Sequence, residues 1–353
     1  MSQTFQDWSC GSGCSPPLNC RLAICTNVAF PQAFSGSAKV QVHVSISHGE
    51  EFSRVHSPSA VWVQSISTRG FEVCSRETGT GSNKTGIINW LAYQSHPKMM
   101  YGSVIFQGMW TTESKCDKVT FSQNFGGRPS VFVSAKYARS TKPDDAMYVW
   151  LENVNSGSFE VCIREFLPFD GKHQDTIVVR EIFLTCFCDY EQTLESLPQL
   201  QPLSSRTLFY PLLPRCFLFF KIYNDWFALL GDGSKFNFTL VGEAFFPNAG
   251  NPTADDNYGF CQQVQFNTTF YASPVVLVSV HHDYDRKVKN HIPPEYNIIT
   301  TWVEEVGLTA MRICVKGLSG SGSKHDPLSV SYVVIGGNTC NLTLDKTIIE
   351  LFY

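Results

Sequence analysis

The sequence predicts an all-β protein made of three tandem antiparallel β-sandwiches. First, the frame Cys-x2-Val-x-Phe-x3-Phe occurs three times, as CTNVAFPQAF at 25–34, CDKVTFSQNF at 116–125 and CQQVQFNTTF at 261–270. Second, each copy is followed by alternating apolar residues, which is typical of a strand with one buried face. Third, no segment shows a sustained helical period with caps.

The first strand after the frame begins at the same place in every copy. Six residues after the second Phe, an alternating run begins at Val40, Val131 and Val276. We therefore expect the three copies to align without a gap through this strand. Its alternation of period two places one set of side chains in a core.

A hairpin is predicted next in each copy. The segments WVQSISTRGFEVC (62–74), WLENVNSGSFEVC (150–162) and WVEEVGLTAMRIC (302–314) each place a Trp twelve residues before a Cys. Apolar alternation, a polar turn and renewed alternation favour two paired strands. We expect the matched Trp residues to pack on the sheet rather than to contact a ligand.

A closing strand completes each copy and sets the domain bounds. GIINWLAY at 86–93 has weaker counterparts in TIVVREIFL at 176–184 and PLSVSYVVIG at 327–336. The predicted organisation is a Cys-rich N-terminal remnant at 1–24, repeats at 25–95, 116–186 and 258–337, a linker or insertion of unknown status at 187–257, and a C-terminal tail at 338–353.

The segment 197–233 differs in composition from its surroundings. Pro211, Pro214, Arg215, Lys221 and Asp225 interrupt it, so it does not reach the roughly 20 apolar residues that a membrane span needs. A buried linker, a partner-binding segment and translated non-coding sequence are the alternatives. The last is slightly favoured because no structural period fits the segment.

Cysteine placement predicts one disulfide in each repeat. Each repeat has one Cys at its start and one in its Phe-x-Val-Cys or Met-x-Ile-Cys strand, which predicts the pairs Cys25–Cys74, Cys116–Cys162 and Cys261–Cys314. Bridges over loops of this length contribute roughly 4 kcal/mol each. Metal binding is the alternative, but no repeat has four Cys or His ligands at finger spacing. The pairing of the remaining cysteines is left open: Cys10, Cys14, Cys20, Cys186, Cys188, Cys216 and Cys340.

Composition indicates an oxidising compartment. The chain has 13 cysteines, and sequons occur at Asn83, Asn237, Asn267 and Asn341. We expect an extracellular protein, glycosylated at Asn83, Asn267 and Asn341. The start MSQTFQDWSCGSGC has no apolar core of a signal peptide, so the N-terminus is expected to be incomplete. A net charge of −4 argues against nucleic-acid binding.

Four segments of repeat 1 together resemble the H-type lectin domain: VAFPQAF, AKVQVHVSI, WVQSISTRGFEV and INWLAY. Repeat 2 is close behind and repeat 3 is more distant. The resemblance implies a six-stranded antiparallel sandwich that binds galactose or N-acetylgalactosamine-type glycans. Domains of this family commonly assemble as trimers, and we hypothesise that the three repeats form such a trimer within one chain. Self-association through the repeats is also expected.

The resemblance also implies a shallow sugar site. It would combine an acidic residue from the loop after the first strand, a basic residue from a neighbouring strand, and a ring beyond the Gly-Phe-x-Val strand. Repeat 2 offers Asp144 or Asp145, Arg164 and Phe166, and is the best candidate. Repeats 1 and 3 have Thr78 and Leu318 in place of the ring. Their other candidates are Glu50, Glu51 and Arg76 in repeat 1, and Asp283, Asp285 and Lys316 in repeat 3.

No catalytic motif is present, so we expect neither an enzyme nor a cofactor. HHDYD at 281–285, with His291 beyond it, contains metal-binding residue types, but an ordinary loop without metal is the favoured interpretation. The expected partners are glycans and glycoproteins, with no nucleic acid and no membrane span, in an adhesion or innate-recognition role. The alternative is a structural or adhesion module of an extracellular matrix in which sugar binding has been lost.

Overall fold

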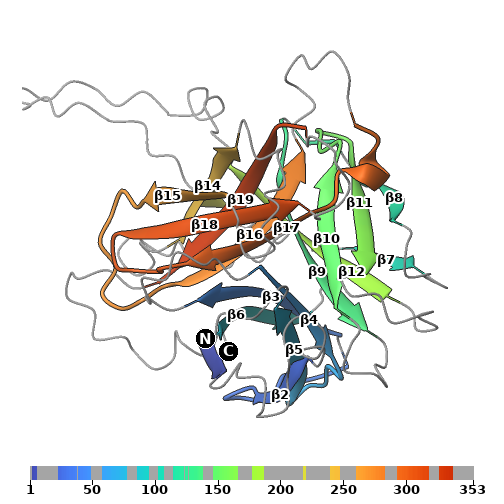
Figure 1. The fold of residues 1–353 in the computed structure, drawn as a ribbon. Helices are drawn as coiled ribbons and strands as arrows, with labels where there is room; N and C mark the ends of the chain where they lie inside the picture. The colour runs from blue at the N-terminus through green and yellow to red at the C-terminus, as the bar shows by residue number, and fades with distance from the viewer. Residues whose placement is uncertain are drawn as a thin grey trace, which may run out of the picture.

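In the computed structural model, nearly all of the described secondary structure is β-strand (Figure 1). It describes residues 2–5, 23–37, 39–48, 58–77, 86–94, 102–106, 114–122, 124–125, 127–137, 146–165, 177–186, 218–219, 239–246, 260–282, 292–317 and 326–336. Within these ranges it contains strands β1 to β19, one short 3-10 helix, η1, and no α-helix. The predicted all-β class is confirmed.

The strands form three units of the same design. Unit 1 contains β1 (Ser2–Phe5), β2 (Ile24–Ala29), β3 (Val40–His48), β4 (Ser59–Gln64), β5 (Gly70–Glu77) and β6 (Gly86–Gln94). Unit 2 contains β7 (Ser103–Phe106), β8 (Lys115–Thr120), β9 (Ser130–Tyr137), β10 (Met147–Glu152), β11 (Ser158–Glu165) and β12 (Ile177–Cys186). Unit 3 contains β14 (Thr239–Phe246), β15 (Phe260–Gln265), β16 (Val275–His282), η1 (Pro294–Tyr296), β17 (Ile299–Glu304), β18 (Ala310–Gly317) and β19 (Leu328–Ile335).

Strand pairing is the same in all three units. The sixth strand of a unit pairs with the first and the third, and the fifth pairs with the fourth and the second. The first strands lie outside the predicted repeats: β1 in the N-terminal stretch, β7 between repeats 1 and 2, and β14 in the stretch assigned to a linker. The short strand β13 (Leu218–Phe219), from the compositionally distinct segment, also pairs with β12.

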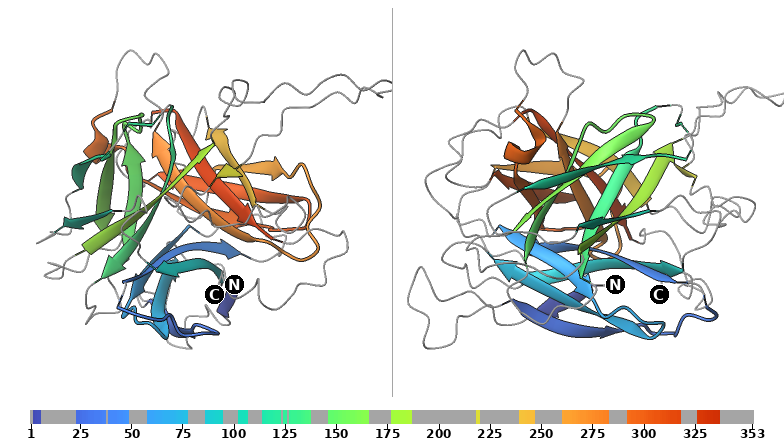
Figure 2. Two further views of the ribbon diagram at one scale, coloured as in Figure 1. Left: turned by 180° about the vertical axis from the view of Figure 1, so that it is seen from behind. Right: turned by 90° about the vertical axis from the view of Figure 1, so that its right-hand side faces the viewer.

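Each of the three sheets combines strands from two units. The strand orders are β1-β6-β3-β17-β18-β15, β14-β19-β16-β10-β11-β8 and β13-β12-β9-β4-β5-β2. At every junction the two units meet through a parallel pair, namely β3 with β17, β16 with β10, and β9 with β4. The units are therefore joined in a closed ring, seen from two further directions in Figure 2. This ring agrees with the hypothesis of a trimer of repeats within one chain.

The matched Trp residues complete the cores of neighbouring units. Trp302 of unit 3 belongs to a cluster that otherwise consists mainly of unit 1 residues, among them Val44, Ile46, Ile88 and Trp90. All three matched indoles, Trp62, Trp150 and Trp302, are at most 1% exposed. In register, Trp62 lies beside Ala135 of unit 2, and Leu151, next to Trp150, lies beside His281 of unit 3. Each Trp thus packs at the junction with the next unit.

In each unit, the repeated Cys-x2-Val-x-Phe-x3-Phe frame supplies one disulfide-bonded Cys and two packed Phe rings at the start of the sandwich. The predicted disulfides Cys25–Cys74, Cys116–Cys162 and Cys261–Cys314 are all present, with S–S distances of 2.03, 1.96 and 1.99 Å. The two Phe residues of each frame pack edge to face, with ring centroids 5.0, 4.8 and 5.3 Å apart in units 1, 2 and 3. An edge-to-face pair of rings stabilises a core by more than the burial of its apolar area alone.

The expected gapless alignment is wrong for the strand that follows the frame in unit 1. The junction registers make Ile46 equivalent to Ala135, since the next residues, Ser47 and Lys136, each lie beside the Val that follows a matched Trp. Ile46 follows Phe34 by 12 residues (46−34), whereas Ala135 follows Phe125 by 10 (135−125). Unit 1 therefore has two extra residues before β3. A shift of two keeps the same side chains on the buried face, because strand side chains alternate with period two.

The predicted hairpins are confirmed and share one turn. Ser65, Asn153 and Glu305, each three residues after a matched Trp, have positive φ angles of 53°, 53° and 52°. Turn hydrogen bonds follow in each copy, with the amides of Ser67, Asn155 and Gly307 donating to the carbonyl oxygens of Gly70, Ser158 and Ala310. The repeated polar turn therefore has a common backbone conformation in which a non-glycine residue adopts the left-handed region.

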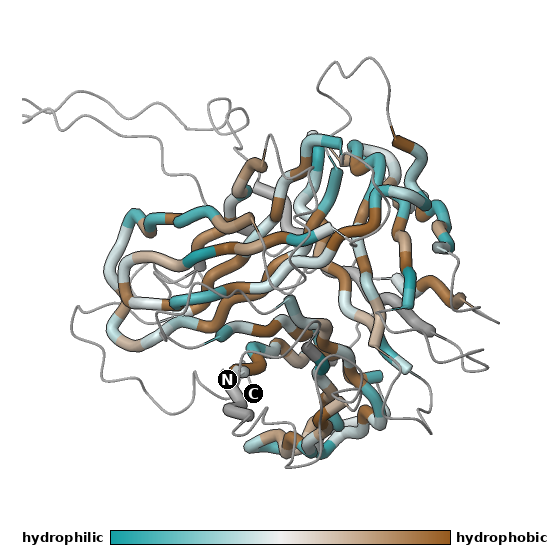
Figure 3. Tube along the Cα trace, viewed as in Figure 1, coloured by the Kyte–Doolittle hydropathy of each residue, from teal (hydrophilic) through white to brown (hydrophobic). Residues whose placement is uncertain are grey.

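The units also meet through the outer faces of β3, β9 and β16. Phe132 of unit 2 packs with Leu277 and Val333 of unit 3, and Leu91 of unit 1 packs against this cluster. The hydroxyl of Ser45 donates to the carbonyl oxygen of Val276, and the Val44 amide donates to Ser134 Oγ at 3.0 Å. Figure 3 shows many hydrophobic residues in the strands, and in β9 and β16 these include residues of the outer faces, Phe132 and Leu277. Both faces of the strands are buried, one in the unit's own core and one between units.

Candidate functional site

The recurrent basic position is buried in two units and partly exposed in one. Arg76, Arg164 and Lys316 occupy equivalent places on β5, β11 and β18, two residues after the disulfide-bonded Cys. Arg76 is 2% exposed and Lys316 is 7% exposed, whereas Arg164 is only half-buried. Unit 2 is thus the one of the three whose basic side chain reaches solvent, which is the unit that sequence reasoning preferred.

Arg164 lies near the end of β11, beside the start of the edge strand β8. Its Nη1 atom donates to Ser114 Oγ at 3.5 Å, and its strand neighbour is Tyr148. Burial lowers the pKa of the Arg164 guanidinium, and the phenol of Tyr148 partly opposes this effect. An arginine remains charged at neutral pH despite such a shift. A charged, partly exposed guanidinium can contact ligand oxygens.

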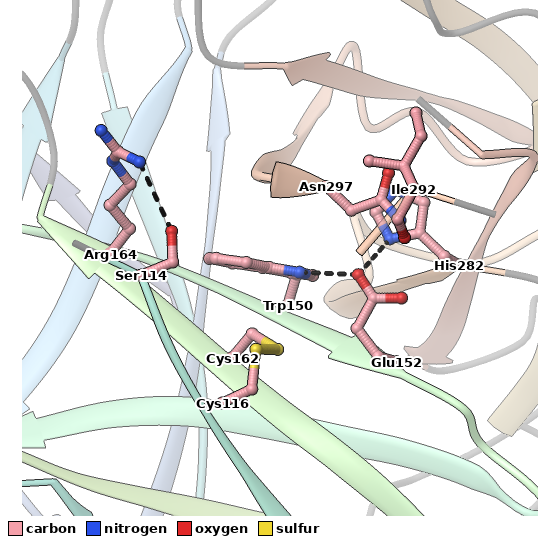
Figure 4. The surroundings of a disulfide bond; sticks show 9 residues. All are labelled: Ser114, Cys116, Trp150, Glu152, Cys162, Arg164, His282, Ile292 and Asn297. Carbon is pink, nitrogen blue, oxygen red and sulfur yellow. Dashed lines mark hydrogen bonds and ion pairs between the residues drawn. A yellow bond between two sulfur atoms is a disulfide. The ribbon is translucent and has the colours of Figure 1, made fainter. Parts of the chain in front are cut away.

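Two buried polar side chains, Glu152 and His282, lie on the side of the Trp150 ring away from Arg164 (Figure 4). Trp150 Nε1 donates to Glu152 Oε1 at 2.8 Å, and His282 Nδ1 lies 2.8 Å from the same oxygen. The side chains of Glu152 and His282 have no exposed surface. Because no ligand can reach them, this Glu and His have a structural role at the junction of units 2 and 3.

A second buried network holds η1 of unit 3 in place. Asp326 Oδ2 accepts hydrogen bonds from the Ile292 amide and from Asn297 Nδ2, both at 3.0 Å. Asn297 Nδ2 also lies 3.2 Å from the Ile292 carbonyl oxygen. These bonds fix the two ends of the turn that contains η1, so its exposed residues have a defined position.

The helix η1 brings an exposed ring to unit 2. It contacts β8, the strand that directly follows Ser114, and Figure 1 shows the two elements side by side. Tyr296 at its end is 57% exposed, and Glu295 beside it is also exposed. Sequence reasoning missed Tyr296, because nothing in PPEY (293–296) signals that this turn meets another repeat.

Most other predicted site residues lie outside the described residues. These are Asp144, Asp145, Phe166, Glu50, Glu51, Thr78, Asp283, Asp285 and Leu318, and the predicted glycosylation sites Asn83 and Asn341. Asn267 is described and exposed, in a bend after β15. Of the predicted sugar-binding set, the structure therefore places the basic residues alone.

Of the residues considered for metal binding, the structure describes His281 and His282, and both are in contact with other side chains. His281 and His282 end β16 and are buried, with His281 Nε2 3.4 Å from Glu243 Oε1. Among the described residues, potential ligand atoms converge at Cys261, Cys314 and Glu304. Both of these sulfur atoms belong to a disulfide and cannot act as thiolate ligands.

Comparisons with models of known protein families, with curated proteins and with solved structures found no match. Across the described ranges, no helix is both long and apolar enough to cross a membrane.

Proposed function

We propose that the protein binds glycans at the boundary between units 2 and 3, through Arg164 and Tyr296. The observation that carries this proposal is the partial exposure of Arg164, because the equivalent Arg76 and Lys316 are buried. A guanidinium beside solvent offers several N–H donors in a fixed geometry, which suits sugar hydroxyl oxygens.

Tyr296 supplies the second chemical requirement of a sugar site. A sugar ring has an apolar face that packs on an aromatic ring, and a tyrosine also offers a hydroxyl group. The ring of Tyr296 is 57% exposed, on a helix that contacts β8 of unit 2. The proposed acidic partners remain Asp144 and Asp145, which follow β9 of unit 2 in the sequence.

The resemblance of the repeats to the H-type lectin domain favours glycans that end in galactose or N-acetylgalactosamine. The three disulfides favour an oxidising compartment, and we infer an extracellular protein. In that setting, recognition of cell-surface glycoproteins in adhesion or innate recognition is the proposed role.

A glycan array tests the proposal. The chain is produced under oxidising conditions and compared with Arg164→Ala and Tyr296→Ala. Both variants should lose selective binding to galactose-type glycans. Matched controls are Arg69→Ala and Tyr271→Ala, which remove an exposed arginine of unit 1 and an exposed tyrosine at another place in unit 3, and these should bind normally. Equal loss in the controls would overturn the assigned site.

One observation favours the alternative of a structural or adhesion module. The basic side chains of units 1 and 3 are buried, so two of three equivalent positions have no access to a ligand. A well-folded protein that binds no sugar on the array would favour this function over glycan binding.

A further inference from the structure

The loops that follow the second strand of each unit are anchored in the same way. In unit 3, the Phe266 amide donates to the Thr309 carbonyl oxygen at 2.7 Å, and the Phe270 amide donates to that of Leu308 at 2.8 Å. Equivalent bonds occur in units 1 and 2, from Phe34 to Thr68 and from Phe125 to Ser156. The residues at these positions can therefore be compared directly between units.

The loop after the second strand and the hairpin turn bonded to it together form one tip of each unit. Only unit 3 has large apolar side chains at this tip. Tyr271, directly after Phe270, is 75% exposed, and Leu308 is 43% exposed. Unit 1 has Ser35 and Thr68 at these positions, and unit 2 has Gly126 and Ser156 in the sequence. Exposed apolar side chains that lie together promote association unless something covers them.

Unit 3 alone also has a sequon in this loop. Asn267, Thr268 and Thr269 correspond to Pro-Gln-Ala at 31–33 in unit 1 and to Ser-Gln-Asn at 122–124 in unit 2. Asn267 is exposed, and it lies in a bend rather than in a paired strand. Both properties are needed for attachment of a glycan to a side-chain amide on a surface loop.

We propose that Asn267 carries an N-linked glycan that covers Tyr271 and Leu308. The five-residue loop 266–270 is held at both ends against 308–309, so its Asn is close to both apolar side chains. The sugar next to the protein can pack its apolar face on the Tyr271 ring, while its hydroxyl groups remain in water. The sequon and the apolar pair occur together in one unit because the glycan compensates for the exposed surface.

The first test measures whether Asn267 carries a glycan. The full chain is secreted from a eukaryotic cell line with an added signal peptide. Glycopeptides from a chymotryptic digest, which separates Asn267 from the sequon at Asn237, are identified by mass spectrometry before and after treatment with peptide N-glycosidase. The peptide with Asn267 should carry a glycan in the parent and in Thr268→Ala, but not in Thr269→Ala, which removes only the third sequon residue. An unmodified Asn267 in secreted parent protein would overturn the proposal.

The second test is protection of the tip. Hydroxyl-radical labelling of the folded, glycosylated protein is compared with that of enzymatically deglycosylated protein. Labelling of Tyr271 and Leu308 should increase when the glycan is removed. Tyr296, exposed but without a neighbouring sequon in the sequence, is the internal control and should not change. Equal labelling of Tyr271 in both samples would show that the glycan does not cover the apolar pair.

Discussion

His282 Nδ1 and Glu152 Oε1 lie 2.8 Å apart across the boundary between units 2 and 3, and neither side chain has any exposed surface. The same oxygen accepts the indole N–H of Trp150. Burial of a carboxylate is costly unless it is paired and hydrogen-bonded. The junction therefore depends on both partners being present.

We predict that His282→Leu strongly destabilises the protein. It leaves the Glu152 carboxylate buried without its imidazole partner, which should lower the free energy of unfolding by about 3–5 kcal/mol. Urea denaturation followed by circular dichroism measures this. The double variant with Glu152→Leu should recover part of the loss, because it also removes the buried charge. A double variant whose loss equals the sum of the two single losses would contradict the pairing.

Replacement by Phe should destabilise the protein to different extents at the three matched Trp positions. Trp150 and Trp302 donate to Glu152 and Glu304, whereas buried Trp62 Nε1 has no hydrogen-bond partner among the described residues. Bonds to charged groups contribute about 1.5–3 kcal/mol. Trp150→Phe and Trp302→Phe should therefore lower the free energy of unfolding by that much more than Trp62→Phe does, as measured by urea denaturation. Equal costs at the three positions would show that the indole N–H groups contribute nothing.

Much of the fold follows from the repeated sequence, and much of the assembly does not. Identity of spacing was enough to predict the disulfides and the hairpins, because those contacts lie within one repeat. Periodicity indicates that Trp302 is buried, but not that it packs in the core of unit 1. The two-residue shift before Ile46 is hidden, because a shift of two leaves the alternating pattern unchanged.

The same limit applies to the candidate site. The sequence presents Arg76, Arg164 and Lys316 as equivalent, yet packing between units buries the first and the last. Tyr296 comes from another unit, through a turn whose position depends on Asp326 and Asn297. No pattern within a single repeat contains that information, since it depends on how the units meet.

Glu243 should make the protein sensitive to acid. A hydrogen bond from His281 lowers the pKa of this carboxyl group, Arg128 contributes in the same direction, and together they outweigh the effect of burial. Arg128 Nη2 lies 2.7 Å from Glu243 Oε2 and belongs to unit 2. A carboxylate with a lowered pKa stabilises the fold fully above its unfolded value of about 4.5, and this contribution is lost as the pH falls through the lower folded value.

The corresponding measurement compares Glu243→Gln with the parent as a function of pH. The variant should be less stable above about pH 5, and the difference should shrink as the pH falls below the ordinary glutamate pKa. Asp117→Asn, at an exposed carboxylate on β8, is the control and should stay within about 0.5 kcal/mol of the parent. A difference for Glu243→Gln that grows towards acid pH would contradict the assigned sign.

The closed ring of shared sheets predicts that the three units unfold together. Each sheet spans two units, and the unit 1 core contains Trp302 of unit 3, so no unit can lose its structure without exposing part of another. Calorimetry should give one transition with a ratio of calorimetric to van't Hoff enthalpy of about one. Ile88→Ala, a fully buried change in unit 1, should cost about 2–5 kcal/mol and move the whole peak to lower temperature. Three units that were independent would instead give a separate early peak for unit 1, while the transitions of units 2 and 3 stayed at their original temperature.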